Sequence, residues 1–185
     1  MDPSKPREAT NTNLEEVAAH RTQPRQLLAV GTKAPDFELK AKPDQRVTLS
    51  SFLGQPVVLV FYPADWSPVC GDQLALYNEL HDVWQTHHAQ LLGISVDQTW
   101  CHLAYARERN LRFPLLSDFE PKGEIARLYG AYEAGEGVAQ RALYVIDRDG
   151  TIAWTHVSPA GINPGADGIL EALEALENRQ EARRV

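Results

Sequence analysis

Cys70 is the side chain of this chain whose surroundings best suit a nucleophile. It follows a valine-rich apolar run, residues 57–62, which predicts a strand buried on both faces. Pro63 ends such a strand because it has no N–H to donate, and Pro68 suits the first position of a helix. Cys70 then lies in the first turn of that helix, where unpaired N–H groups and the helix dipole favour a thiolate over a thiol.

A buried cysteine that packs only as a small hydrophobe is the commoner fate of a single thiol. The position of Cys70 argues against this alternative, because the functional groups of open α/β sheets gather beyond the carboxyl ends of the strands. A helix that begins directly after a buried strand starts at that edge. The sequence therefore predicts thiol chemistry, in which a thiolate attacks an electrophile.

Cys101 occupies a similar place in the next predicted unit. Residues 90–96 form a second apolar run that predicts a buried strand, and Asp97 is expected to cap a helix over residues 99–108. Strand, helix and strand then form a right-handed βαβ unit with parallel strands. Both thiols would emerge at the same edge of the sheet, and local unwinding would bring them together.

The rest of the chain predicts further strands and helices around this unit. We expect short strands at 36–40 and 46–50 and an extended segment at 113–116. A helix over 122–129 should end at Gly130, and a polar loop at 133–137 should follow it. A hairpin of 141–147 with 151–157 and an amphipathic helix after residue 168 complete the chain. We expect one domain over residues 27–180. An extension over residues 1–26, partly ordered or a short helix, precedes it, and a tail over residues 181–185 follows.

Composition excludes several classes of protein. The 185 residues are 43% hydrophobic and 23% charged, which is ordinary for a globular domain. A net charge of −7 argues against nucleic acid or an anionic membrane surface as the main partner. Residues 1–25 contain no apolar signal segment, and no run is long enough to span a membrane. Two cysteines are too few for a disulfide scaffold, so a reducing cytoplasm is the expected location.

Four segments resemble the signature segments of the peroxiredoxins, the AhpC/TSA family of thiol peroxidases. They are PADWSPVC at 63–70, VGTKAPDF at 30–37, FPLLSD at 113–118 and RALYVID at 141–147. The region DFEPKG at 118–123, with YG at 129–130, most resembles the AhpE-type branch. The resemblance covers roughly residues 27–178. It implies a thioredoxin-like α/β fold, a central mixed β-sheet flanked by helices on both faces, which the order of predicted elements also fits.

The resemblance implies roles for the residues around Cys70. Cys70 attacks a peroxide and becomes a sulfenic acid, Pro63 shields the pocket, and Ser67 hydrogen-bonds the thiolate and the peroxide. Backbone N–H groups near Val69 and Cys70 complete the binding site. Ser67 also reads as the N-cap of the helix, and the two roles are compatible. The family more often carries threonine at this position.

Arg141 and Gln73 are the two polar residues that the resemblance adds from outside the cysteine motif. From its residue type and position alone, Arg141 is expected to be an ordinary surface charge at the start of a strand. The resemblance instead makes it the guanidinium that stabilises the thiolate and the charge developing on the peroxide oxygens. Gln73 matches a position where the family often has a polar residue that hydrogen-bonds the site.

Cys101 leaves two mechanisms open. It would condense with the Cys70 sulfenic acid as a resolving cysteine, or it would be a core thiol beside Trp100 while an external thiol resolves Cys70. AhpE-type relatives commonly have one cysteine, and resolving cysteines in this helix usually lie further along it. A resolving cysteine near the C-terminus is absent from residues 178–185. We expect Cys101 to resolve Cys70.

Other readings of the same residues are weaker. Cys101 and His102 suggest a metal site, with His81, His87, His88 and His156 as further candidates, but no zinc-type cluster is present in the sequence. A disulfide oxidoreductase would need a Cys-x-x-Cys pair, which the sequence lacks. A redox-sensing or binding module on the same fold is a third alternative. Trp66 and Trp100 either shape the peroxide entrance or pack as ordinary aromatic residues.

We therefore expect a peroxidase that reduces hydrogen peroxide and organic hydroperoxides. The resemblance implies a thioredoxin- or glutaredoxin-like reductant and no flavin, haem or metal cofactor. It also implies a homodimer, built on an edge strand or on surfaces near the active site. Neither nucleic acid nor membrane is expected as a partner.

Overall fold

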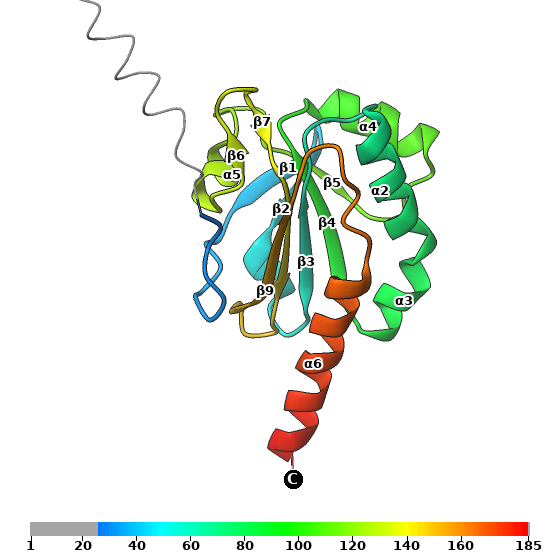
Figure 1. Cartoon of the computed structure of the whole chain (residues 1–185). Helices are drawn as coiled ribbons and strands as arrows, with labels where there is room; N and C mark the ends of the chain where they lie inside the picture. The colour runs from blue at the N-terminus through cyan, green and yellow to red at the C-terminus, as the bar shows by residue number, and fades with distance from the viewer. Residues whose placement is uncertain (1–25, 185) are drawn as a thin grey trace, which may run out of the picture.

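A computed structural model describes residues 26–184 of the chain (Figure 1). The extension predicted for residues 1–26 lies outside the described residues, except for Gln26. Within the described part, no helix is long and apolar enough to cross a membrane.

A mixed sheet of seven strands forms the centre of the fold, with strand order β2-β1-β5-β4-β3-β8-β9. β3, β4 and β5 are parallel, whereas β1, β8 and β9 run antiparallel to their neighbours. The strands are β1 (Glu38–Lys42), β2 (Gln45–Thr48), β3 (Val57–Phe61), β4 (Gln90–Ser95), β5 (Leu115–Ser117), β8 (Arg141–Ile146) and β9 (Ile152–Ser158). A separate two-stranded hairpin joins β6 (Tyr132–Glu133) to β7 (Val138–Ala139).

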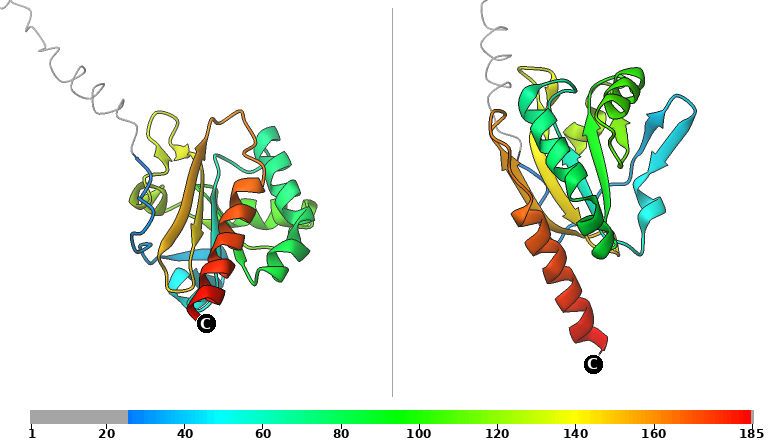
Figure 2. Two further views of the ribbon diagram at one scale, coloured as in Figure 1. Left: turned by 60° about the horizontal axis from the view of Figure 1, so that its bottom comes forward. Right: turned by 90° about the vertical axis from the view of Figure 1, so that its right-hand side faces the viewer.

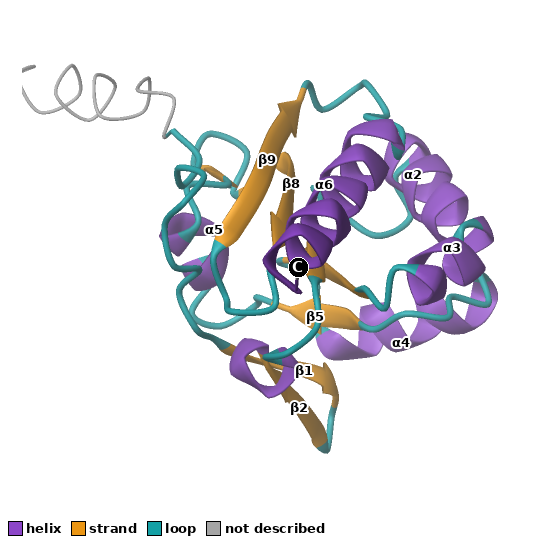
Figure 3. Ribbon diagram, turned by 90° about the horizontal axis from the view of Figure 1, so that it is seen from below, coloured by secondary structure: helices purple, strands orange, loops and turns teal. Residues whose placement is uncertain are grey.

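Helices cover both faces of this sheet (Figures 1 and 3). One face carries α2 (Pro68–Glu79), α3 (His81–Thr86), α4 (Thr99–Glu108) and α6 (Asp167–Arg184). The other carries α5 (Glu124–Leu128), the 3₁₀ helix Leu49–Phe52 and the β6–β7 hairpin. Figure 2 shows α6 lying along the sheet beside α2. The predicted thioredoxin-like α/β fold, with a mixed sheet between helical layers, is confirmed.

β3 joins the two layers of the core. All five of its residues are buried, and their side chains alternate between the faces of the sheet. Val58 and Val60 belong to the cluster under α2 and α6, whereas Leu59 and Phe61 belong to the cluster under α5. A central strand between two helical layers must therefore be apolar on both faces. The loop that follows β3 starts from this buried carboxyl end.

Several predicted boundaries differ from the structure for identifiable reasons. In the sequence, apolar residues recur at helical spacing from Leu74 to Trp84, which predicts one continuous helix, but α2 stops at Glu79 and α3 begins at His81. The Trp84 indole N–H donates to the backbone carbonyl of Tyr77 at 2.7 Å, within the last turn of α2. The β6–β7 hairpin was expected to be only a loop, and α6 runs through the tail boundary predicted at residue 180.

α5 is shorter than predicted and begins with a buried carboxylate. Gly123 precedes the helix in the left-handed region, with φ of 65°. The Asp118 carboxylate accepts the N–H groups of Ile125 at 3.1 Å and Ala126 at 2.8 Å. Burial raises the pKa of Asp118 to about 6, although these two bonds act in the opposite direction.

The raised pKa of Asp118 predicts a pH-dependent stability. Between about pH 4 and 6 the folded chain keeps a proton on Asp118 that the unfolded chain has released, so the free energy of unfolding falls as pH rises through this window. Above it both states are ionised and the contribution is constant. Urea denaturation of the wild type and of Asp118→Asn across this window should show that the substitution removes the fall.

Asp36→Asn is the matched control for this measurement. Its carboxylate accepts the backbone N–H groups of Phe37 and Ser50, which lower its pKa despite partial burial. Its contribution to stability is therefore lost only at more acidic pH, and this variant should keep the fall seen in the wild type. An unchanged fall in Asp118→Asn would contradict the account.

Candidate active site

Cys70 lies in the first turn of α2, as the sequence predicts. The helix begins at Pro68, and the preceding Ser67 has the extended backbone of an N-cap residue. The Ser67 hydroxyl accepts the backbone N–H of Cys70 at 3.4 Å. The Cys70 side chain is fully buried against the sheet. The thiol is thus enclosed in the core at the positive end of the helix, which favours an anion there.

Arg141 lies beside this thiol. It begins β8, whose neighbour β3 ends at Phe61, and Phe61 pairs with Ala142. The start of β8 therefore meets the end of β3 at the edge where α2 begins. The Arg141 Nη2 is 3.5 Å from the Cys70 Sγ, and Arg141 is buried, not the surface charge that its sequence position alone indicates.

Neutral oxygens hold the guanidinium in place. The Nε and Nη2 atoms of Arg141 donate to the carbonyl of Ala160 at 3.3 and 2.7 Å, and Nη1 donates to Oε1 of Gln73. Gln73 in turn donates to the Tyr77 hydroxyl at 3.2 Å, which donates to the carbonyl of Gly165 at 2.9 Å. Within residues 26–184 no carboxylate pairs with Arg141. Its charge is therefore available to the thiolate and to an anionic reaction partner.

The network also fixes which groups carry protons. Burial raises the pKa of Tyr77 to about 12, although its bond with Gln73 and the charge of Arg141 lower it. Tyr77 therefore remains a hydroxyl that donates to Gly165 at neutral pH. Gln73 is fully buried and bridges this tyrosine to Arg141, so the structure places it at the site as the sequence predicts.

The loop between β3 and α2 contains the remaining predicted residues. Pro63 and Ser67 are half-buried at its two ends, and Val69 is half-buried in the first turn of α2. Trp66 has φ of 64°, a left-handed conformation that is unusual for a bulky side chain. Such strain costs about 1–3 kcal/mol and persists only where neighbouring contacts compel it.

Asp65 supplies those contacts from the middle of the loop. Its carboxylate is fully buried, accepts the Tyr62 hydroxyl at 2.8 Å and lies 2.9 Å from Nδ1 of His102. Its backbone N–H donates to Asp97 Oδ2 at 2.8 Å. Asp97 was predicted to cap α4, and this is wrong: Gln98 is the N-cap residue, and the Asp97 carboxylate is occupied by the loop.

Cys101 lies in the first turn of α4, as predicted, and is partly exposed. The structure places it beside the loop, where burial first, and then a hydrogen bond and the charge of Asp65, raise its pKa to about 11. Cys101 is therefore a protonated thiol at neutral pH. Both cysteines are free, and the structure records no hydrogen bond between them.

The carboxylates beside Cys101 form a hydrogen-bonded cluster. Ligand atoms of Asp65, Asp97 and Cys101 lie within 4.8 Å of one another, the one such group found in the described part of the chain. The Asp65 oxygens already bind Tyr62 and His102, and Asp97 Oδ2 accepts both the Asp65 N–H and the Ser95 hydroxyl. These occupied oxygens do not fit a metal centre. The predicted histidine candidates do not join this group.

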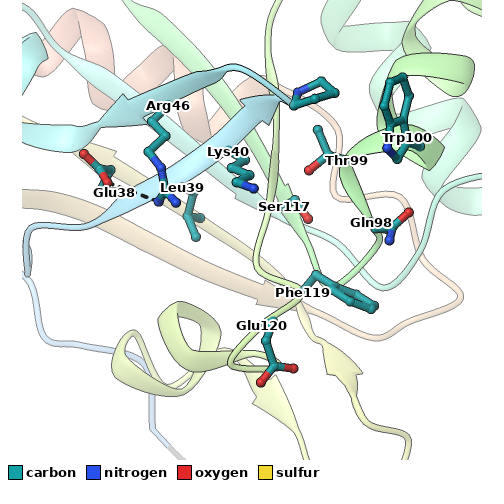
Figure 4. A pocket seen from close by; sticks show the side chains of 11 residues that line it. Glu38, Leu39, Lys40, Arg46, Gln98, Thr99, Trp100, Ser117, Phe119 and Glu120 are labelled. Atoms are coloured by element: carbon teal, nitrogen blue, oxygen red, sulfur yellow. Dashed lines mark hydrogen bonds and ion pairs between the residues drawn. The ribbon is translucent and has the colours of Figure 1, made fainter.

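The two exposed tryptophans have different surroundings. Trp66 packs edge-on against Tyr105, with 5.0 Å between the ring centroids. Tyr105 belongs to the same hydrophobic cluster as Cys70. Trp100 instead lines a pocket of about 340 Å³ with Phe119, Gln98 and Lys40 (Figure 4). Neither cysteine lines that pocket. Trp66 therefore contacts the cluster that contains Cys70, whereas Trp100 lines a separate pocket.

Sequence reasoning missed two kinds of site residue. The carbonyls of Ala160 and Gly165 are backbone groups, so no residue type marks them. Asp65 lies within the segment at 63–70 and His102 follows Cys101, but their pairing joins residues that are distant in the chain. A buried Asp is rare unless it is paired, so the burial of Asp65, which only the structure shows, is what points to a partner.

Comparisons with known proteins agree with this geometry. The AhpC/TSA family model matches residues 30–155. 2-Cys peroxiredoxin BAS1, chloroplastic, of Arabidopsis thaliana is 33% identical over 174 residues, covering 88% of this chain and 65% of the relative. The chain therefore spans just under two thirds of that relative's length. Alkyl hydroperoxide reductase E of Mycobacterium tuberculosis is 34% identical over 136 residues, covering 73% of this chain and 89% of the relative.

A solved structure is similar over most of the fold. The reduced 2-Cys peroxiredoxin of Plasmodium vivax superposes with a TM-score of 0.76 and 28% identity, covering 83% of this chain and 84% of that one. The segment that the AhpC/TSA family model matches, residues 30–155, includes the loop between β3 and α2, α2 itself and β8, which together hold the thiol and the guanidinium. By family model, sequence identity and fold, the chain belongs to the AhpC/TSA family of peroxiredoxins.

Proposed function

We propose that this chain is a thiol peroxidase in which Cys70 reduces hydrogen peroxide or an organic hydroperoxide. The observation that carries the proposal is the Arg141 guanidinium 3.5 Å from the Sγ of a cysteine in the first turn of a helix. The Cys70 thiolate attacks one peroxide oxygen and the O–O bond breaks. The other oxygen leaves with a proton as water or an alcohol, and Cys70 becomes a sulfenic acid.

Arg141 acts on the charge that moves during this attack. Negative charge passes from the thiolate sulfur to the leaving oxygen, and a fixed guanidinium stabilises both positions. Its anchors to Ala160 and Gln73 hold it in that place before the peroxide arrives. Ser67, and the backbone N–H groups near Val69 at the helix start, are the proposed further donors to the peroxide.

Cys101 is the proposed resolving residue. Its thiol attacks the Cys70 sulfenic acid, the S–O bond breaks, and the hydroxyl leaves as water with the Cys101 proton. Both residues lie in the first turns of helices that follow adjacent parallel strands, which supports this pairing. A dithiol of the thioredoxin or glutaredoxin type then reduces the disulfide. This cycle needs no cofactor.

The proposal extends to assembly and location. A homodimer formed through the edge strand β9 is supported by the exposed Val157 on that strand. Two unpaired cysteines fit a reducing compartment such as the cytoplasm.

Sedimentation of the wild type and of Val157→Lys tests the dimer: the substitution should shift the chain to monomer.

Replacement of Arg141 by lysine tests the reaction with peroxide. Lysine keeps the charge but cannot donate to Cys70, Gln73 and Ala160 together. We expect stopped-flow oxidation of Cys70 by hydrogen peroxide to slow by on the order of a hundredfold, the effect of losing a positioned donor to a developing oxyanion.

Arg112→Lys is the control for this substitution, because Arg112 is exposed and pairs with Asp82 on the surface. It should leave the rate unchanged. An Arg141→Lys variant that reacts as fast as the control would remove the observation that carries the proposed function.

Replacement of Cys101 by serine separates the two resolution mechanisms. If Cys101 resolves Cys70, the variant should still reduce one equivalent of peroxide but lose turnover coupled to thioredoxin, because no internal disulfide forms. A coupled assay with thioredoxin and thioredoxin reductase measures the turnover. Full turnover in the variant would show that an external thiol resolves Cys70.

A further inference from the structure

No step of the cycle proposed above uses the buried contact between Asp65 and His102. The two side chains are almost fully inaccessible, and Nδ1 of His102 lies 2.9 Å from Oδ2 of Asp65. The other ring nitrogen, Nε2, is buried without a hydrogen-bond partner in the described structure. Burying a ring nitrogen without a hydrogen bond costs free energy. The contacts that the structure gives this ring are made by Nδ1, with Asp65 Oδ2 and, at 3.5 Å, with the Tyr62 hydroxyl.

The contact with Asp65 lies on the active-site loop. Asp65 is two residues after Pro63 and two before Ser67, the N-cap that touches the Cys70 backbone. Between Asp65 and Ser67 stands Trp66 in its left-handed conformation. A strained residue between two anchors relaxes if either anchor is lost, and relaxation here would move Ser67.

Asp65 has three anchors of its own. The Tyr62 hydroxyl and His102 hold its carboxylate, and Asp97 holds its backbone N–H. Burial and the charge of Asp65 raise the pKa of Tyr62 well above its usual value, so Tyr62 remains a donor. His102 is the one anchor of the carboxylate that comes from a distant element, α4. It therefore fixes the loop against the helix that faces it.

We propose that His102 is a positioning residue for the oxidation of Cys70, acting through Asp65. It holds the loop so that Pro63 and Ser67 stand in the geometry that peroxide attack requires. The inference builds on the proposed peroxidase function. Displacement of such groups by about 1 Å slows a reaction by up to a hundredfold, so loss of the contact should appear in the rate.

Two variants of His102 test this role. His102→Leu removes the donor to Asp65, whereas His102→Asn places an amide near the position of Nδ1 and keeps one. We expect His102→Leu to slow oxidation of Cys70 by hydrogen peroxide roughly tenfold or more, and His102→Asn to restore most of that loss. Stopped-flow fluorescence of Trp66 and its neighbours, with one equivalent of peroxide, measures the rate.

Alkylation of Cys70 by iodoacetamide provides a second readout. This reaction needs an accessible thiolate but no peroxide geometry, so the positioning role predicts little change in it. General loosening of the fold would instead expose the buried thiol and accelerate alkylation. A selective loss of peroxide reactivity therefore identifies positioning.

His87→Leu is the matched control. His87 pairs with Glu177 at 2.9 Å between α3 and α6, away from the loop. The His87→Leu substitution removes the same kind of contact and should leave the rates of peroxide oxidation and of alkylation within about twofold of the wild type. If His102→Leu fails to fold, Tyr62→Phe removes the hydroxyl anchor from the same carboxylate and should slow oxidation in the same selective way.

The outcomes separate the two proposals. A wild-type Cys70 that reacts with peroxide no faster than free cysteine overturns the peroxidase function itself. If the wild type reacts fast with peroxide and His102→Leu reacts no more slowly than the wild type or His87→Leu, only the positioning role is overturned.

Discussion

The site depends on one buried contact, that between the Arg141 guanidinium and the Cys70 sulfur. A charge removed from water is unfavourable unless hydrogen bonds replace its hydration. Here Gln73 and the carbonyl of Ala160 replace it, and both are neutral. Because no carboxylate among residues 26–184 pairs with Arg141, its positive charge acts on the sulfur and on any oxygen anion bound beside it.

This requirement explains why distant parts of the fold meet at the site. Arg141 must begin a strand next to β3, so that its side chain reaches the start of α2. The segment after β9 must return over it to present the Ala160 carbonyl. The apolar layers on both faces of β3 keep these elements in register, since every β3 residue is buried.

The loop at the end of β3 is the second requirement, and its anchors come from two elements. Asp97 at the end of β4 and His102 on α4 both bind Asp65. The same first turn of α4 carries Cys101, whose thiol is kept protonated by burial and by Asp65. The Asp65 carboxylate thus contributes both to the anchoring of the loop before Cys70 and to the environment of Cys101.

Features that depend on neighbouring residues in the chain were predicted from the sequence. The valine-rich run, Pro63 and Pro68 gave the strand, the loop and the helix start, because each acts on its own neighbours. Arg141 needed the family resemblance, since nothing within its own strand shows that it is buried. Asp97 was assigned to the wrong role because its carboxylate binds the Ser95 hydroxyl and the backbone of Asp65, which is distant in the chain. Backbone acceptors such as Ala160 carry no sequence signal at all.

In the proposed function, Sγ of Cys70 is the atom that peroxide oxidises. Its most direct test is the wild-type chain mixed with one equivalent of hydrogen peroxide, quenched with acid, and mapped by non-reducing peptide mass spectrometry. We expect Cys70 to be the first residue modified, either with one added oxygen or joined to Cys101 with the loss of two hydrogens. A Cys70 that stays reduced while Cys101 or another side chain is oxidised would contradict it.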